Sequence, residues 1–327
     1  MKNQVYYLVK SQTFGEKKLS LGNLQPDYVR VRHLYCGVCG SDLSHFRGVR
    51  GKFPISLGHE FISEVLDVNS DKTTLCSGDL VVSDFNFRCN DCDACKKRLS
   101  HLCVQNDIQF FSNRAFAQFS DIHYSYLFKV NELKSIKSGT VIEPLSCVLH
   151  ATNEIKISPD DKVLLIGCGN IGTSVALYFF TKKNQDQIKI YDKIENKSKV
   201  LSEIFDYDTS SRPYKNEYDI VIDTSNHISG LELSTSCCRP GGQVISISHH
   251  YGSNVSVAYD TIIEKEIKIS FPLRNGEPHN MEKAYEIIKN CWKKDYDILF
   301  GIHRLENIRT VFEQKLSYKE NKIILSV

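Results

Sequence analysis

Three side chains that could bind one metal ion lie in the stretch YCGVCGSDLSHFRGVRGKFPISLGHE. They are the thiol of Cys39, the imidazole of His59 and the carboxylate of Glu60. A catalytic zinc ion uses these donor types when it keeps one coordination position open for a substrate. Ser41 and Asp42 follow Cys39 closely. The trio alone is only suggestive, and its interpretation depends on features later in the chain.

A second cluster consists of cysteines alone. Cys89, Cys92 and Cys95 are separated by two residues each, and Cys103 follows after seven more. This spacing favours a closed tetrahedral structural zinc site over disulfides or unpaired thiols. Metal binding there would supply the folding free energy of a loop that lacks a core of its own. We expect the cluster to carry no chemistry.

Glu143 stands in apolar surroundings before Pro144, in the segment VIEPLSCVLHATNEI. A glutamate in this context usually marks the start of a helix, where the positive end of the helix dipole favours its charge. Completion of a zinc shell is the other interpretation, and it needs the support of the remaining motifs. Cys36 and Cys147, the two other thiols near these motifs, are interpreted as packing residues.

The segment SPDDKVLLIGCGNIGTSVALYFF predicts a turn, a buried strand, a glycine loop and an apolar helix. The loop fits G-x-G-x-x-G, and its place between strand and helix is the context of a dinucleotide-binding fingerprint. The helix N-terminus would favour the phosphate charge. The candidate nucleotide contacts in this loop are Gly167, Gly169, Asn170, Ile171 and Gly172.

The next predicted strand, QIKIYD, ends at Asp192. A carboxylate at this position can accept hydrogen bonds from both ribose hydroxyls and would repel a 2′-phosphate. Asp192 therefore favours NAD over NADP. Lys197, a further candidate contact, and Lys193 lie nearby and weaken that preference.

The loop FRGVRGKFP, between Cys39 and His59, carries the three cations Arg47, Arg50 and Lys52. A solvated surface is one interpretation of this loop. The other is an anion site for a phosphorylated substrate, with Arg50 as its main residue, because the loop connects two ligands of the same metal. The sequence leaves both open.

The bulk properties describe an ordinary globular protein. Its 327 residues are enough for two domains, and its composition is 41% hydrophobic and 24% charged. The net charge of +2 gives no reason to expect nucleic acid or a membrane as partner. We find neither a signal peptide nor a membrane-spanning run. We expect a cytoplasmic protein whose twelve cysteines are thiols and metal ligands.

Strand-like segments, such as NQVYYLV, YVRVRHLY, FISEVLDV and GDLVVSDF, dominate the first part of the chain. Strands and helices then alternate, which predicts a mostly parallel sheet with helices on both faces. We expect an α/β protein with a β-rich catalytic domain at 1–145 and a doubly wound Rossmann domain at 146–278. The segment 279–327, with the strand ENKIILSV, is expected to return to the first domain.

The motifs CGVCGSD, GHE, C-x2-C-x2-C-x7-C, EPL and GxGxxG occur here in one order and spacing. With them, the chain resembles the zinc-dependent medium-chain dehydrogenases over nearly its whole length. Within that family it is similar to the polyol branch, which includes sorbitol and threonine dehydrogenases. The resemblance implies a GroES-like catalytic domain, two zinc ions, NAD(H), a homodimer or homotetramer, and hydride transfer between nicotinamide and a secondary alcohol or ketone.

The resemblance also implies roles for single residues. Cys39, His59 and Glu143 would be the ligands of the catalytic zinc, and Glu60 a nearby carboxylate that can approach or exchange at the metal. Ser41 would relay the proton of the alcohol, and Asp42 would orient the metal-binding histidine.

A narrower and more diffuse similarity concerns the ribulose-5-phosphate reductases that make ribitol 5-phosphate. It lies in NQVYYLV, the FRGVR loop and PLRNGE, and it would give Arg50 a phosphate to bind. Some of those reductases prefer NADPH, whereas Asp192 argues for NADH. An unphosphorylated polyol is the alternative substrate.

Two other classes of protein remain open. Simple alcohol and formaldehyde dehydrogenases commonly place a cysteine where this chain has Glu143, followed by Pro144. A non-catalytic nucleotide-binding relative should have lost a metal ligand or Ser41, and this chain retains them. Both classes are therefore disfavoured.

The chain departs from the family pattern at two places. Ser63 stands where the family usually has glycine, so we expect different local packing. Ser44 stands where a relay histidine is often found, and His45 follows it, which leaves the outer proton relay open.

Overall fold

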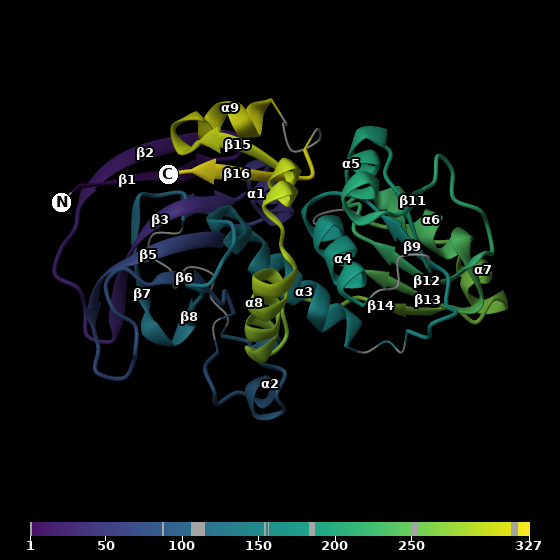
Figure 1. The fold of residues 1–327 in the computed structure, drawn as a ribbon, viewed down its shortest axis with the longest axis horizontal. Coiled ribbons are helices and arrows are strands. Elements are labelled where there is room, and N and C mark those ends of the chain that lie inside the picture. The colour runs from purple at the N-terminus through teal and green to yellow at the C-terminus, as the bar shows by residue number, and fades with distance from the viewer. Residues whose placement is uncertain are drawn as a thin grey trace.

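The computed structural model describes residues 2–86, 88–105, 115–153, 155, 157–182, 187–249, 254–314 and 320–327. Two units lie side by side (Figure 1). One is rich in strands and contains both chain ends, and the other is built on a parallel sheet flanked by helices. The predicted fold class, a β-rich unit joined to a Rossmann-type α/β unit, is confirmed.

The β-rich unit contains two sheets. The smaller sheet has the order β2-β1-β4, and the larger has the order β15-β16-β3-β5-β6-β8, with β7 paired to β3. The strands are β1 (Lys2–Lys10), β2 (Thr13–Ser20), β3 (Tyr28–Gly37), β4 (Ile55–Ser56), β5 (Glu60–Asn69), β6 (Leu80–Ser83), β7 (Phe119–His123), β8 (Leu127–Lys129), β15 (Phe300–Arg304) and β16 (Lys322–Ser326).

Two of these strands show what the sequence predicts and what it does not. In β3, Val29 and Val31 are buried and alternate with more exposed residues, which is the period of a half-buried strand. In β2, Phe14 is the buried residue and charged side chains prevail. The sequence does not predict β2 because its pairing with β1, and not an apolar alternation, makes it a strand.

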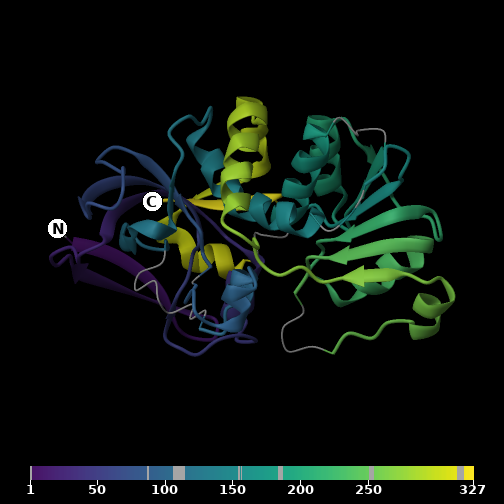
Figure 2. The same cartoon turned by 90° about the horizontal axis from the view of Figure 1, so that it is seen from below.

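The α/β unit is a six-stranded parallel sheet of order β11-β10-β9-β12-β13-β14. Helices α4 and α5 lie on one face and α6 and α7 on the other (Figure 2). The strands are β9 (Val163–Ile166), β10 (Ile188–Tyr191), β11 (Asp208–Thr209), β12 (Tyr218–Asp223), β13 (Cys238–Ser246) and β14 (Lys268–Ser270). The helices are α4 (Asn170–Thr181), α5 (Glu195–Phe205), α6 (Ile228–Cys237) and α7 (Tyr259–Glu264).

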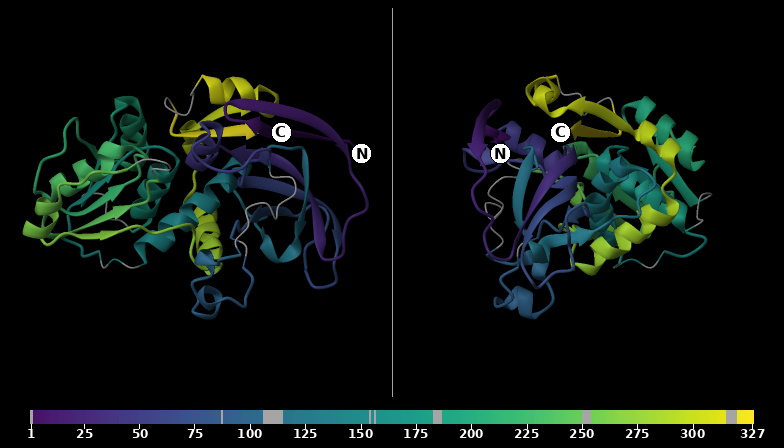
Figure 3. Two further views of the ribbon diagram at one scale, coloured as in Figure 1. Left: turned by 180° about the vertical axis from the view of Figure 1, so that it is seen from behind. Right: turned by 60° about the vertical axis from the view of Figure 1, so that its left-hand side comes forward.

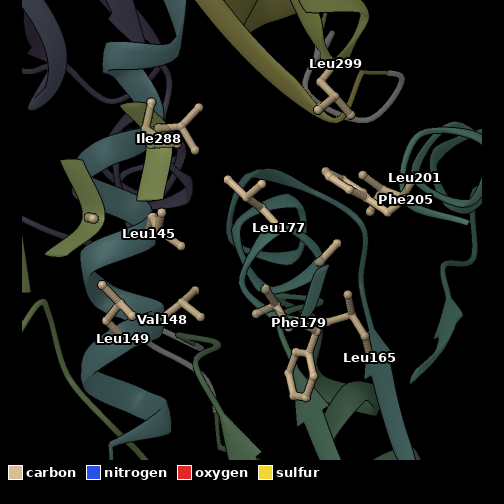
Figure 4. Close-up of a cluster of buried hydrophobic side chains, with 14 of the residues drawn as sticks. Leu145, Val148, Leu149, Leu165, Leu177, Phe179, Leu201, Phe205, Ile288 and Leu299 are labelled. Carbon is tan, nitrogen blue, oxygen red and sulfur yellow. The ribbon is translucent and has the colours of Figure 1, made fainter. Parts of the chain in front are cut away.

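Two helices, α3 (Ile142–Thr152) and α8 (His279–Cys291), lie between the two units. Leu145 and Val148 of α3 belong to the same buried cluster as Ile288 of α8 and Leu177 of α4 (Figure 4). Burial of such apolar side chains stabilises the arrangement by about 25 cal/mol for each Å² removed from water. The joint between the units is therefore a continuous hydrophobic core.

The C-terminal segment joins the β-rich unit. The predicted final strand is β16, which pairs antiparallel with β3 and parallel with β15. The short helix α9 (Ile308–Glu313) precedes it. The first and last strands of the chain thus lie in the same unit, and the α/β unit is inserted between them.

Ser63 of β5, the departure noted in the sequence, has a specific partner in the strand core. Its hydroxyl lies 2.7 Å from Nδ1 of His33, and the hydroxyl of Ser120 lies 2.9 Å from Nε2 of the same ring. Burial lowers the pKa of His33 to about 3. The two serines thus satisfy a neutral imidazole inside the sheet.

Among the described residues, no helix is both long and apolar enough to span a membrane.

Candidate active site and metal centres

Cys39, His59 and Glu60 meet where the two units face each other. Cys39 directly precedes helix α1 (Gly40–Phe46), Glu60 is the first residue of β5, and His59 directly precedes it. Each of the three offers one ligand atom, and these atoms lie within 4.8 Å of one another. His59 and Glu60 are buried. The residues that the sequence proposed for one metal ion are thus within reach of one ion.

Asp42 connects the two segments that carry these donors. Its Oδ2 accepts the amide of Cys39 at 2.9 Å, and its Oδ1 accepts the amide of Gly58 at 3.4 Å. The same Oδ1 lies 3.8 Å from Nδ1 of His59. Asp42 is 1% exposed. Its position agrees with the orienting role that the resemblance implied, because it contacts both the thiol segment and the histidine.

Glu143 is the second residue of α3 and lies near this group, with electrostatic interactions with His59 and Glu60. It lies outside the set of donors that share the 4.8 Å limit among the described residues. The sulfur of Cys147, one helical turn further, is 3.6 Å from Glu143 Oε1. The sequence had assigned Cys147 to packing alone, and its place beside Glu143 makes it part of the site wall.

The electrostatics of the site fit a bound cation. Burial raises the pKa of the Cys39 thiol well above its usual value, and the charges of Glu60 and Asp42 raise it further. Burial also raises the pKa of Glu143 to about 7. Within the described residues, Nδ1 of His59 has no hydrogen-bond partner. A divalent cation would supply the positive charge that these buried donors lack.

Lys322 is a site residue that the sequence analysis did not single out. It lies in β16, is 1% exposed, and its Nζ donates to Glu60 Oε2 at 2.6 Å and to Asn170 Oδ1 at 2.7 Å. Asn170 Nδ2 in turn donates to Glu60 Oε1 at 2.6 Å. A charged residue within the apolar strand KIILS was the available signal. Its partners could not be inferred from it.

These bonds set the charge of Glu60. Burial opposes ionisation of Glu60, but the Lys322 ammonium and the His59 ring outweigh burial and hold its pKa below the ordinary value. Both carboxylate oxygens are engaged, one with Lys322 and one with Asn170. The metal-donor group and the glycine loop are thereby joined through one buried carboxylate.

The glycine loop has the geometry that its motif predicts. Gly167 has a φ of +96°, a backbone conformation that favours glycine. A Cβ on Gly172 would lie 1.9 Å from the carbonyl oxygen of Gly167, so the turn requires glycine there. A Cβ on Gly169 would meet nothing within 4 Å. Asn170 and Ile171 begin α4, and open space beside a helix N-terminus suits a phosphate.

Asp192 follows β10 and accepts two backbone amides, from Cys168 with Oδ2 and from Ile194 with Oδ1, both at 2.7 Å. Lys197 lies in the first turn of α5, is buried, and interacts electrostatically with Asp192. Burial lowers the pKa of Lys197. Carboxylate and ammonium therefore lie together beside the glycine loop, where the sequence placed the ribose end of a nucleotide.

The four-cysteine cluster forms a lobe around the short helix α2 (Asp93–Lys96). The ligand atoms of Cys89, Cys92, Cys95 and Cys103 lie within 4.8 Å of one another. The sulfurs of Cys89 and Cys95 are 3.9 Å apart, as are those of Cys92 and Cys103.

Backbone amides of Cys95 and Val104 lower the pKa of Cys92 to about 6. Four thiols at this spacing, one of them with a thiolate near neutral pH, fit a tetrahedral zinc ion. We call residues 89–105 the cysteine lobe.

The residues that the sequence analysis considered for a proton relay, Ser41, Ser44 and His45, lie in α1. Ser41 is half-buried, and its hydroxyl is hydrogen-bonded to Cys39. The hydroxyl of Ser44 donates to the carbonyl of Gly40 at 3.1 Å, so it is directed back along its own helix. His45 is buried, and a Cβ on Gly51 would lie 2.5 Å from its Nδ1. His45 therefore packs under the basic loop.

That basic loop follows α1 directly. Arg47 and Lys52 are exposed, and Arg50 is half-buried. Arg50 is thus the cation of the loop that the fold holds closest to the protein interior.

Residues 25–132 match the family described as the alcohol dehydrogenase GroES-like domain, which confirms the predicted character of the β-rich unit. A grapevine L-idonate 5-dehydrogenase is 32% identical over 180 residues, which cover 52% of this chain and about half of that relative, 48%. A D-arabitol-phosphate dehydrogenase of Enterococcus avium is 24% identical over 94% of this chain and 92% of its own length.

Solved structures share the whole architecture. The galactitol-1-phosphate dehydrogenase of Escherichia coli superposes with a TM-score of 0.84 at 20% identity, covering 99% of this chain and 100% of its own. The likeness at this identity concerns the fold. With the GroES-like match over residues 25–132 and the polyol dehydrogenases among its relatives, the chain is similar to the zinc-dependent medium-chain dehydrogenases, and in particular to polyol dehydrogenases.

Proposed function

We propose that the protein is a zinc-dependent polyol dehydrogenase that transfers a hydride between NAD(H) and a secondary alcohol or ketone. One observation carries the proposal. The donors Cys39, His59 and Glu60 come within 4.8 Å of one another, and Glu60 is bonded to Asn170 of the glycine loop at 2.6 Å. A metal site and a nucleotide site that share a buried residue suit a reaction between a metal-bound substrate and a nicotinamide ring.

In this proposal Cys39, His59 and Glu143 hold the catalytic zinc, and Glu60 is a carboxylate that can approach it. A zinc ion there would act as a Lewis acid on the hydroxyl or carbonyl of the substrate. Asp42 keeps the Cys39 amide and His59 in place through its two oxygens. Ser41 moves the proton of the alcohol towards solvent, supported by its half-buried position beside Cys39.

The nucleotide is proposed to be NAD(H) in preference to NADP(H). The glycine loop would hold the pyrophosphate against the start of α4. Asp192 would accept the ribose hydroxyls, and its charge would oppose a 2′-phosphate. Lys197 would contact the same ribose, supported by its buried place beside Asp192.

The cysteine lobe is proposed to bind a second, structural zinc through Cys89, Cys92, Cys95 and Cys103. We further propose a homodimer or homotetramer in the cytoplasm. All twelve cysteines are free in the structure, which is in keeping with a reducing compartment.

The substrate is proposed to be a polyol or polyol phosphate, with ribulose 5-phosphate to ribitol 5-phosphate as the specific reaction. Relatives of both kinds are similar to this chain, a D-arabitol-phosphate dehydrogenase and sorbitol dehydrogenases. Arg50 would bind the phosphate, because it is the half-buried cation of the loop between Cys39 and His59. An unphosphorylated polyol would leave Arg50 as a surface residue.

The test is a matrix of initial rates, with NADH and NADPH against D-ribulose 5-phosphate, ribulose and fructose, with and without a zinc chelator. We expect the chelator-sensitive rate to depend on the phosphate and to be higher with NADH. Activity on the free sugars alone would indicate a sorbitol-like reaction with an unphosphorylated polyol as substrate. Absence of any rate from zinc-loaded protein would contradict all three of these substrates and leave the fold and metal interpretation unchanged.

Arg50→Gln should raise KM for the phosphorylated substrate by about 10- to 100-fold, the value of a hydrogen bond to a charged group. Its effect on the free sugar should be small. Arg47→Gln is the matched control, because Arg47 lies in the same loop but is exposed. Equal effects of both variants, or no effect of either, would contradict the phosphate role of Arg50.

A further inference from the structure

The chain crosses between the two units twice. It leaves the β-rich unit through α3, which leads to β9, and it comes back through residues 271–278, between β14 and α8. We call residues 271–278 the return segment. It passes beside the cysteine lobe, which lies at the lower end of α8 (Figure 3). The lobe therefore lies next to one of the two covalent joints between the units.

Two charged side chains of the return segment are bonded to the lobe. Oε1 of Glu277 accepts the amide of Ser100 at 3.3 Å and its hydroxyl at 3.2 Å. Nη1 of Arg274 donates to the carbonyl of His101 at 2.5 Å. Ser100 and His101 are buried, and both lie in the short 3₁₀ helix Ser100–Leu102 of the lobe. The contacts thus converge on a single turn of the lobe.

That turn is attached to a candidate zinc ligand. The amide of Cys103 donates to the carbonyl of Ser100 at 3.0 Å, and Cys103 ends the 3₁₀ helix. An ion bound to Cys103 would therefore also hold Ser100, whose amide and hydroxyl both donate to Glu277. The apolar side chains of this stretch, Leu99, Leu102 and Val104, are exposed, and the ring of His101 lies 4.6 Å from that of His150. A bound ion would therefore contribute much of what holds the stretch in place.

The far side of the return segment is held by a buried polar group. Asn275 Nδ2 donates to Asp84 Oδ1 at 3.0 Å, and Asn275 also bonds to Asn86. Asn280, at the start of α8, donates from its side chain to the carbonyl of Asn275 at 2.8 Å. Arg274 and Gly276 have positive φ angles of 60° and 66°. The return segment thus has one defined conformation, with contacts on two sides.

We infer that Glu277 and Arg274 are positioning residues through which the cysteine lobe and its metal fix the return segment, and with it the α/β unit relative to Glu143 and His59. The lobe then acts on more than its own folding. It holds the return segment in one position, and that segment helps to set the distance between the nucleotide and the metal donors. Such distances decide whether reacting groups come close enough to react. The inference rests on the proposed structural zinc and is independent of the substrate.

The test is hydrogen exchange on the full-length, zinc-loaded protein, with zinc counted by native mass spectrometry. Cys92→Ser, which removes a lobe ligand, and Glu277→Ala should each raise amide exchange in residues 274–280 by about tenfold, the signature of local opening. Strand β9 should keep its protection. The double variant should show no further increase, because both changes release the same contact.

Two controls separate this positioning role from general destabilisation. Glu277→Gln keeps an acceptor oxygen for Ser100 and should retain the wild-type protection. Glu282→Ala removes an exposed carboxylate from the first turn of α8 that is not bonded to the described residues of the lobe, and it should leave exchange at 274–280 nearly unchanged. Wild-type exchange at 274–280 in Cys92→Ser, or additive effects in the double variant, would overturn the inference.

The reciprocal measurement covers the case in which Cys92→Ser does not fold. Coupling acts in both directions, so Glu277→Ala should speed loss of zinc from the lobe to a chromophoric chelator. It is measured in Cys39→Ser protein, in which the lobe holds the remaining zinc. An unchanged rate would overturn the inference. Neither measurement uses a substrate, so either can fail while polyol turnover stands.

Discussion

The two candidate metal centres use the same kind of ligand in opposite surroundings. In the cysteine lobe, the donors are four thiols, of which Cys103 is buried and the others are half-buried. Backbone amides lower the pKa of Cys92, whereas burial raises the pKa of Cys95. Around Cys39, the donors are mixed, and burial together with the charges of Glu60, Asp42 and Glu143 raises the pKa of the thiol. In the lobe, the backbone thus stabilises part of the negative charge. The inner centre depends on a cation and on its neighbours.

This difference has a functional meaning. A closed shell of four thiolates leaves a zinc ion no free position, whereas a thiol, an imidazole and carboxylates can leave one. The inner centre is also the one bonded to the glycine loop, through Glu60 and Asn170. The donor types and the contact with the glycine loop therefore both distinguish the inner centre from the lobe.

The largest expected effect comes from the inner centre. Cys39→Ser should reduce turnover by roughly 1,000-fold or more, since the substrate would lose its Lewis acid. The zinc content should fall from two to one, and NADH should bind with nearly unchanged affinity. Initial rates, native mass spectrometry and NADH fluorescence would measure this. Full turnover in Cys39→Ser would end the zinc assignment.

Removal of a lobe ligand should act on stability first. Cys92→Ser should lower the thermal midpoint markedly, because a structural zinc supplies folding free energy to its loop. Turnover per folded molecule should fall by no more than about 100-fold, the scale of a misplacement of about 1 Å between the reacting groups. Thermal unfolding of wild type and variant would be compared, and their rates would be measured well below the temperature at which the variant begins to unfold. A loss of turnover as large as in Cys39→Ser would erase the distinction between the centres.

Lys322 tests the neighbours of the inner centre. Lys322→Met leaves the Glu60 carboxylate buried without its ammonium partner, which should cost about 3–5 kcal/mol of unfolding free energy. Lys322→Arg keeps the charge and should lose much less. Urea unfolding followed by the single tryptophan, Trp292, would measure both. Recovery of stability in Lys322→Met with Glu60→Gln would assign the loss to the unpaired charge.

The smallest expected effect concerns His33, a buried histidine that is not a candidate metal ligand. His33 is buried within the sheet and pairs with the neutral Ser63 and Ser120. Its folded pKa of about 3 lies below the ordinary 6.5. Between pH 6.5 and about pH 3, His33 is therefore protonated in the unfolded chain and neutral in the folded chain.

Stability from His33 should thus be complete above pH 6.5 and decline towards pH 3, by about 2 kcal/mol at pH 5. Urea unfolding of wild type and His33→Gln at pH 7 and pH 5 would be compared, with the glutamine variant lacking this part of the decline. The same pH dependence in both proteins would show that burial of His33 does not govern it.

Much of the fold was predictable because it is encoded locally. The alternation of β3 and the apolar strand and glycine loop of β9 and α4 each lie within one stretch of chain. Strand β2 was missed, because its residues are polar and its partner β1 defines it. Helix α1 was missed too, since it is only seven residues long and directly follows the candidate ligand Cys39.

The sequence by itself determined which donor types this protein has and at which spacing, because C-x2-C clusters, GHE and GxGxxG are short-range patterns. Only the tertiary structure decided their partners. Lys322 reaches Glu60 across 262 residues of chain, and Glu277 reaches Ser100 across 177. A charge within a strand, or an acidic residue before a helix, has no preferred partner until the fold buries it beside one. Burial then makes that partner necessary.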